Sequence, residues 1–274
     1  MSGRVEDHYA NPAIVPRILT AVRQVNGADA PITPDVLAPL DHFHGRGVLA
    51  TREMVAMLSP QKGDRVLDIG CGIGGPARWI AARIGCHVTG VDLTQAFCDA
   101  AVVLNAITGL AERVRIMQGN ALALPLPDDA FDRAYTQNVA MNIADKRGMY
   151  REALRVLRRG GILALSNVCA GPNGDPYFPV PWAATAATSF LTTPDATHDD
   201  LRAVGFEIMQ FRETTQSVLA DQIKDRQRME TTGLPPLGVH LIIGDRARQY
   251  RINSARSLED GRTAVIEALV RKPA

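Results

Sequence analysis

Apolar runs and segments with helical spacing alternate between residues 64 and 166. The apolar runs lie near residues 65–69, 88–91, 113–117, 131–136 and 161–168. The helical segments between them lie near residues 76–84, 95–108 and 146–158. This alternation predicts a parallel sheet with helices on both faces. Two later apolar runs, residues 205–211 and 263–272, predict two further strands.

Three segments fall outside this alternation. Residues 13–25 place Ile14 and Ile18 on one side of a helix, which predicts an amphipathic helix that caps the core. Residues 237–257 predict one long helix between the last two strands. Residues 170–197 are rich in glycine and proline and follow the fifth strand, at the edge where open sheets bind ligands. We therefore expect this loop to be a lid.

A glycine cluster follows the first predicted strand. Gly70, Gly72 and Gly75 have the spacing G-x-G-x-x-G and lead into a helical pattern, so backbone N–H groups should face a ligand. Asp92 ends the second strand, where a carboxylate accepts hydrogen bonds from the hydroxyls of a ribose. The pair predicts a nucleoside-cofactor site on a doubly wound sheet. The glycine spacing alone leaves a dinucleotide cofactor, and thus an NAD-dependent oxidoreductase, open.

Further motifs follow in order. Asp68 lies two residues before the first glycine, where its carboxylate would repel a pyrophosphate. The sequence Q-G-N-A at 118–121 follows the third strand, F-D at 131–132 begins the fourth, and R-V-L-R-R-G-G at 155–161 precedes the fifth. These spaced motifs resemble those of the class I S-adenosylmethionine-dependent methyltransferases, and the resemblance covers roughly residues 40–215.

The resemblance implies the fold and its organisation. It implies an α/β fold with a doubly wound, Rossmann-like sheet of seven strands, mostly parallel with an antiparallel last strand. We expect a single methyltransferase domain over residues 1–274. Within it we expect a helical cap (1–60), a cofactor-binding core (61–169) and a C-terminal part with the lid, a long helix and the last strands (170–274).

The resemblance also implies the cofactor, S-adenosyl-L-methionine. Its cationic amino-acid end would lie at Asp68, and its ribose at Asp92. The residues that we expect to bind it are Asp68, Gly70, Cys71, Gly72, Gly74, Asp92, Leu93, Asn120, Ala121 and Gln137.

For the methyl acceptor, the chain resembles the sarcosine/dimethylglycine N-methyltransferase-like branch. Relatives there often carry histidine where this chain has Asn138, so that base is absent here. We expect His44, Gln137 and Asn138 to be catalytic. We expect the acceptor, a small molecule, to contact Phe43, His44, Met141, Asn142, Tyr177 and Trp182.

The leading hypothesis is methyl transfer to a nitrogen of an amino acid or small amine. Transfer to oxygen, carbon or sulfur of a secondary metabolite or quinone-like ring is the same-class alternative. An NAD-dependent oxidoreductase and a catalytically silent binding module are the alternatives from other classes.

Composition narrows the partners. Thirty Lys and Arg residues nearly balance 29 Asp and Glu residues, and no basic run indicates nucleic acid. The four cysteines lack the spacing of a zinc site, so we expect no metal. The absence of a signal-like segment and of a long apolar run predicts a cytoplasmic protein with no membrane span. A homodimer is left open.

Overall fold

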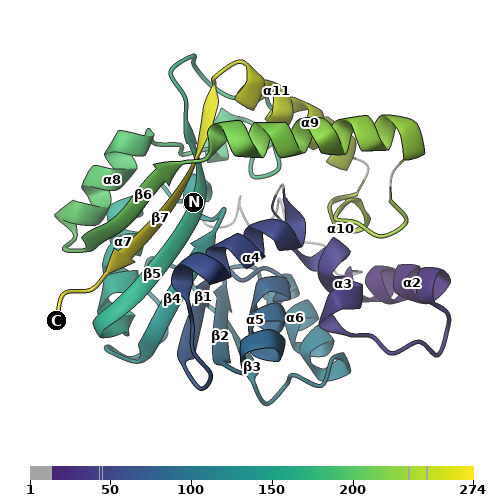
Figure 1. Ribbon diagram of the computed structural model, residues 1–274, viewed down its shortest axis with the longest axis horizontal. Coiled ribbons are helices and arrows are strands. Elements are labelled where there is room, and N and C mark those ends of the chain that lie inside the picture. Colours follow the sequence, from purple (N-terminus) through teal and green to yellow (C-terminus); the bar gives the residue numbers. More distant parts are fainter. Residues whose placement is uncertain (1–13, 43, 45, 234, 245) are drawn as a thin grey trace.

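Seven strands form one sheet in the computed structural model, which describes residues 14–42, 44, 46–233, 235–244 and 246–274. The strand order is β3-β2-β1-β4-β5-β7-β6 (Figure 1). The strands are β1 (Arg65–Ile69), β2 (His87–Asp92), β3 (Val114–Gln118), β4 (Phe131–Gln137), β5 (Leu157–Ala170), β6 (Glu207–Glu213) and β7 (Thr263–Arg271). The order reverses between β1 and β4, so the carboxyl ends of these two strands flank the crevice where such sheets bind ligands.

The strand directions confirm the predicted sheet. Strands β1 to β5 pair in parallel, whereas β7 is antiparallel to both of its neighbours, β5 and β6. The fold class is therefore the predicted Rossmann-like, doubly wound sheet with an antiparallel strand from the end of the chain.

Helices cover both faces because neighbouring residues on each strand point to opposite faces. On one face, α4 (Gly47–Leu58) and α5 (Gly75–Ile84) bury Met54 and Ile80 against Val66 and Tyr135. On the other face, α7 (Lys146–Val156) and α8 (Pro194–Ala203) pack on a second core that contains Leu67 and Ala134. Helix α6 (Gln95–Ile107) packs beside β2 and β3.

The N-terminal cap contains α2 (Ile14–Asn26) and α3 (Pro34–Asp41) as well as α4. Ile14, Ile18 and Val22 of α2 are buried, as the amphipathic pattern predicts, and they share a core with Phe97 and Leu104 of α6. The cap is therefore packed on the helical layer beside the glycine loop.

The segment between β6 and β7 corrects the sequence-based prediction. The predicted single helix at 237–257 is wrong: the chain forms α10 (His240–Ile243) and α11 (Ala247–Glu259), with Gly244 between them at φ 80°. A longer helix, α9 (Thr215–Thr232), was not predicted because its apolar residues are few and widely spaced. In Figure 1 α9 and α11 lie at the top of the view, whereas α10 lies at the right, where it contacts both α2 and α3.

Two boundaries also differ. Strand β5 begins at Leu157 rather than near 161, because residues 157–160 continue as strand after α7. The Gly- and Pro-rich loop ends earlier than predicted, at Thr193, whose side chain caps α8. Between β5 and α8 this loop contains one short 3-10 helix, η2 (Ala186–Thr188). No helix in the described ranges is both long and apolar enough to cross a membrane.

Candidate active site

The loop from β1 to α5 depends on its glycines. Gly70, Gly72 and Gly74 have φ angles of 79°, 54° and 78°, a region that side chains with a Cβ rarely adopt. A Cβ on Gly70 would lie 2.3 Å from Cγ2 of Val139, so this glycine also makes room for the segment after β4. The backbone N–H groups of Gly70 and Cys71 donate to the carbonyl of Val91, which ties the loop to β2.

Two carboxyl groups lie near the ends of β1 and β2: Asp68 is buried and Asp92 is half-buried. Asp68 is 2% exposed and accepts a 2.7 Å hydrogen bond from the hydroxyl of Tyr135. Asp92 accepts hydrogen bonds from the N–H groups of Gly72 (2.8 Å) and Thr94 (2.9 Å). Asp92 therefore orders the glycine loop directly.

These carboxyl groups lack positive charge nearby. Burial, together with repulsion from Asp92, raises the pKa of Asp68 to about 7, although the Tyr135 hydrogen bond opposes the rise. Burial also raises the pKa of Asp92, against its backbone hydrogen bonds. No basic side chain in the described part of the chain forms an ion pair with either. The site thus favours a cationic ligand and opposes a pyrophosphate.

The loop after β3 is brought to the same edge. The N–H of Gly119 donates to the carbonyl of Asp92, and the side chain of Gln118 donates to the carbonyl of Leu93. Asn120 closes a turn by accepting the N–H of Leu122. Leu93, Asn120 and Ala121 are therefore next to the end of β2, as a nucleoside site requires.

A polar cluster joins the cap to the end of β4. Oγ1 of Thr51 lies 2.8 Å from Nδ1 of His42, 3.2 Å from Nε2 of His44 and 3.4 Å from Oε1 of Gln137. When the Thr51 hydroxyl donates to Oε1, which only accepts, each of the two histidines donates an N–H to Thr51. His44 then carries its proton on Nε2 and keeps a lone pair on Nδ1.

The Nδ1 atom of His44 is shielded from solvent and has no hydrogen-bond partner among the described residues. Burial, followed by the charges of His42 and Arg46, lowers the pKa of His44 to about 3. Burial and Arg78 lower the pKa of His42 to about 4. Both imidazoles are therefore neutral at physiological pH.

The sequence did not point to Thr51. It lies on the buried side of α4 with Met54, Val55 and Leu58, and a polar residue in an apolar helical stripe was the available signal. Asp41 and Arg78 were also missed. Nη2 of Arg78 lies 2.8 Å from Oδ2 of Asp41, and both side chains are buried, so the cap is bound to the helix that follows the glycine loop.

Asn138 contributes through its backbone. Its φ of 56° is left-handed, and its N–H donates to the carbonyl of Ser166 on the neighbouring strand. This turn directs Val139 onto Gly70. Phe43, predicted to contact the acceptor, lies outside the residues that the structure describes.

Trp182 lies in a small core under the loop. It is 4% exposed and packs with Met141, Val180 and Ala183, while its Nε1 donates to Ser189. Its expected contact with the acceptor stays a prediction. Asn142 supports this core by donating to the carbonyls of Trp182 and Thr188.

Tyr177 anchors the same loop at its other end. Its ring lies between the guanidinium groups of Arg256 and Arg262, 4.0 and 4.2 Å from the ring centre, and its hydroxyl donates to Asp260. These contacts hold it against the end of α11 and the turn before β7, so Tyr177 anchors the loop; its expected contact with the acceptor stays a prediction.

Known proteins resemble this chain in its cofactor-binding core. A family model described as a methyltransferase domain matches residues 67–165. A sterol 24-C-methyltransferase of Gibberella zeae is 37% identical over 103 residues, 38% of this chain and 27% of that protein. An O-methyltransferase of Aspergillus sclerotiorum is 31% identical over 173 residues, 61% of this chain and 64% of that protein. The chain thus spans less than two thirds of either relative.

Solved structures share the fold over nearly the whole chain. A geranyl diphosphate C-methyltransferase from Streptomyces coelicolor, in complex with S-adenosyl-L-homocysteine, has a TM-score of 0.72 and 17% identity, covering 99% of this chain and 97% of that one. The [4+2]-cyclase SpnF has a TM-score of 0.70 and 22% identity, covering 100% and 97%.

The domain match, the motif order and the seven-stranded sheet agree with one another. The predicted recognition is confirmed for the domain: residues 67–165 are a methyltransferase domain, and the fold is that of class I S-adenosylmethionine-dependent methyltransferases.

Proposed function

We propose that this protein transfers the methyl group of S-adenosylmethionine to a small molecule, at a nitrogen that carries a proton. The observation that carries the proposal is the pair of carboxyl groups beside the glycine loop, buried Asp68 and half-buried Asp92, with no basic partner in the described chain. A cationic ligand compensates this charge, whereas the pyrophosphate of NAD would be repelled. The cofactor would be held by Asp68, Gly70, Cys71, Gly72, Gly74, Asp92, Leu93, Asn120, Ala121 and Gln137.

S-adenosylmethionine, when bound, supplies an electrophilic methyl group on a sulfonium. The protein's own task is then to orient the acceptor, exclude water and accept a proton. His44 offers a lone pair for it: Thr51 bonds its Nε2, and its Nδ1 is otherwise unused among the described residues, although burial makes this imidazole a weak base. Gln137, which accepts from Thr51, connects this base to the end of β4.

A hydroxyl oxygen is the second candidate acceptor. The same neutral imidazole would accept a hydroxyl proton, and the O-methyltransferase of Aspergillus sclerotiorum matches a large share of this chain. Transfer to carbon needs no proton acceptor before the methyl moves, so the His44 geometry favours it less.

Mass spectrometry tests the proposal. The protein is incubated with S-adenosylmethionine carrying a deuterated methyl group and with pools of small amines and phenols. We expect an amine product heavier by one trideuteromethyl group in place of a hydrogen. If only phenols gave a product, the acceptor atom would be an oxygen and not the proposed nitrogen. Tight cofactor binding without any product would favour a silent binding module, and binding of NAD without S-adenosylmethionine would overturn the proposal.

A further inference from the structure

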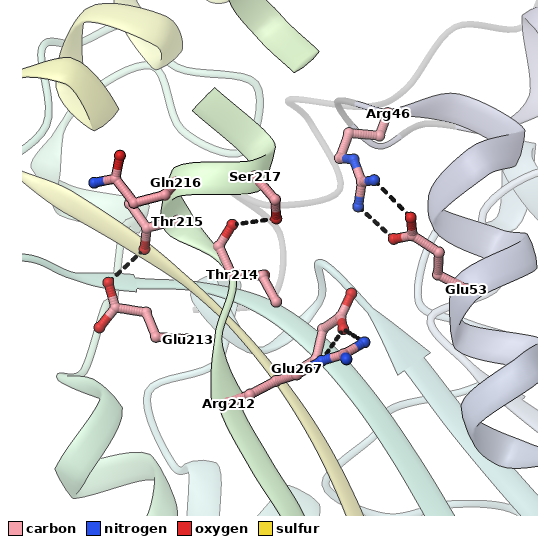
Figure 2. Close-up of a pocket in the computed structure, with 9 residues that line it drawn as sticks. All are labelled: Arg46, Glu53, Arg212, Glu213, Thr214, Thr215, Gln216, Ser217 and Glu267. Carbon is pink, nitrogen blue, oxygen red and sulfur yellow. Dashed lines mark hydrogen bonds and ion pairs between the residues drawn. The ribbon is translucent and has the colours of Figure 1, made fainter. Parts of the chain in front are cut away.

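A cavity of about 460 Å³ lies between α4, the start of α9 and the strands β6 and β7 (Figure 2). Ligand pockets commonly have volumes of this order, but most are lined by apolar side chains. All nine residues that line this one are polar or charged: Arg46, Glu53, Arg212, Glu213, Thr214, Thr215, Gln216, Ser217 and Glu267. An apolar ligand would therefore gain little by entering it.

The guanidinium groups in this cavity are already neutralised. Arg46 makes two hydrogen bonds to Glu53, at 2.5 and 2.7 Å, and a third to Asp221 at 2.7 Å. Arg212 donates to Oε2 of Glu267 at 2.5 and 2.8 Å. An anion would have to break one of these pairs, and a cation would compete with the guanidinium groups for the same carboxylates.

The remaining hydrogen-bonding capacity suits hydroxyl groups. Carboxylate oxygens keep free lone pairs after one bond, and they form strong charge-assisted bonds with hydroxyl donors. Both Arg212 bonds go to Oε2 of Glu267, so its Oε1 keeps lone pairs, and Ser217 donates to the carbonyl of Thr214. The cavity thus offers acceptors and hydroxyl groups with no uncompensated positive charge in its lining.

The sheet register connects this cavity to the proposed active site. Gln137 pairs with Ser166, Ser166 with Glu267, and Glu267 with Arg212. Residues paired in register point to the same face, so a polar row crosses β4, β5, β7 and β6. Two strand spacings separate Gln137 from Glu267, about 10 Å. On the side of the cap, Arg46 of the cavity lies two residues after His44 in the sequence.

We propose that this cavity binds a neutral, hydroxyl-rich group, of the sugar or polyol class, and that the methyl acceptor carries this group. The claim that the methyl acceptor carries this group rests on the proposed function, whereas the claim that the cavity binds a sugar does not. The reacting atom would lie near His44 and Gln137, and the hydroxyl-rich group at Glu267 and the start of α9.

Ligand-observed NMR tests the binding without any methyl transfer. The full chain with S-adenosylhomocysteine is mixed with one sugar at a time: methyl β-D-glucopyranoside, D-glucosamine or D-glucose 6-phosphate. We expect saturation transfer to the ring protons of the neutral glucoside and none to the phosphate. Absence of transfer to the glucoside, or tenfold tighter binding of either charged sugar, would overturn the proposal.

Two substitutions in α9 test where the sugar binds. Gln216 lines the cavity, and Gln227 is exposed on the same helix outside that lining. Gln216→Trp should weaken glucoside binding at least tenfold, and Gln227→Trp should leave it unchanged. Equal effects of the two variants would mean that the sugar binds elsewhere. If no acceptor is ever methylated while the glucoside binds as expected, the proposed function fails and the sugar site remains.

Discussion

The hydroxyl of Tyr135 donates a 2.7 Å hydrogen bond to Oδ2 of Asp68 in the middle of the sheet. The two residues are paired in register on the neighbouring strands β4 and β1. This bond stabilises the ionised carboxylate, but burial outweighs it, so the pKa of Asp68 is about 7. The charge at the cofactor site is therefore set by pH in the physiological range.

Cofactor binding should depend on this proton. As pH falls below about 7, Asp68 in the free protein becomes protonated and no longer attracts a cation, so the Kd for S-adenosylmethionine should rise. Each pH unit corresponds to about a tenfold change at most. Isothermal titration from pH 5.5 to 8.5 measures it. Asp68→Asn should bind weakly with a flat pH profile, and an unchanged profile would exclude Asp68 from the site.

The same group predicts the pH dependence of stability. Its folded pKa of about 7 exceeds the ordinary aspartate value of 3.8, so the folded state retains the proton more strongly. This contribution to the free energy of unfolding is complete below about pH 4 and declines as pH rises to about 7. Urea titrations of the free protein should show that Asp68→Asn removes this decline, and an identical slope in both proteins would contradict the assignment.

His44→Asn should lower kcat by about 10²- to 10⁴-fold, the usual effect of losing a general base. The Kd for S-adenosylmethionine should stay within twofold, because the expected role concerns the acceptor. Since the pKa of His44 is about 3, its protonation should not reduce the rate between pH 5 and 8. His87→Gln, at an exposed position, is the control. Equal loss of rate in both variants would contradict a catalytic role.

Gly70→Ala should destabilise the protein more than Gly109→Ala. Both glycines have left-handed φ angles, 79° and 71°, which cost an alanine about 1–2 kcal/mol. At Gly109 a Cβ meets nothing within 4 Å, whereas at Gly70 it lies 2.3 Å from Val139. Overpacking should add about 1–3 kcal/mol at Gly70. Urea unfolding of the two variants measures the difference, and equal losses would show that Val139 moves aside freely.

The two ion pairs between α3 and α5 should differ in strength. Arg78 and Asp41 are buried, whereas Arg83 and Asp35 are exposed to solvent. Arg78→Met leaves a buried charge unpaired and should cost about 3–5 kcal/mol. Arg83→Met should cost less than about 1 kcal/mol. Thermal and urea unfolding compare them; similar costs would mean that Asp41 finds another partner or becomes protonated without loss.

Trp182→Ala should act on stability rather than on acceptor binding. The ring is buried among Met141, Val180 and Ala183, and its removal leaves a cavity that should cost about 3–5 kcal/mol. Trp182→Phe keeps most of the volume and should cost less. If Trp182→Ala is as stable as the unchanged protein and only its KM for the acceptor rises, the ring lines the acceptor pocket.

The amino-acid sequence by itself determined the sheet and the cofactor end of the site. Buried strands and a left-handed glycine loop are local features, so residues 65–75 and Asp92 could be located from spacing alone. The strand directions followed from the alternation of strands and helices.

The tertiary structure decided what depends on packing between distant segments. Thr51 meets Gln137 across 86 positions, which no local pattern encodes. Trp182 is a core residue because Met141 and the loop fold over it, although its surroundings in the sequence are those of an exposed loop. The polar row from Gln137 to Arg212 exists only because strand register aligns four strands that are far apart in the chain.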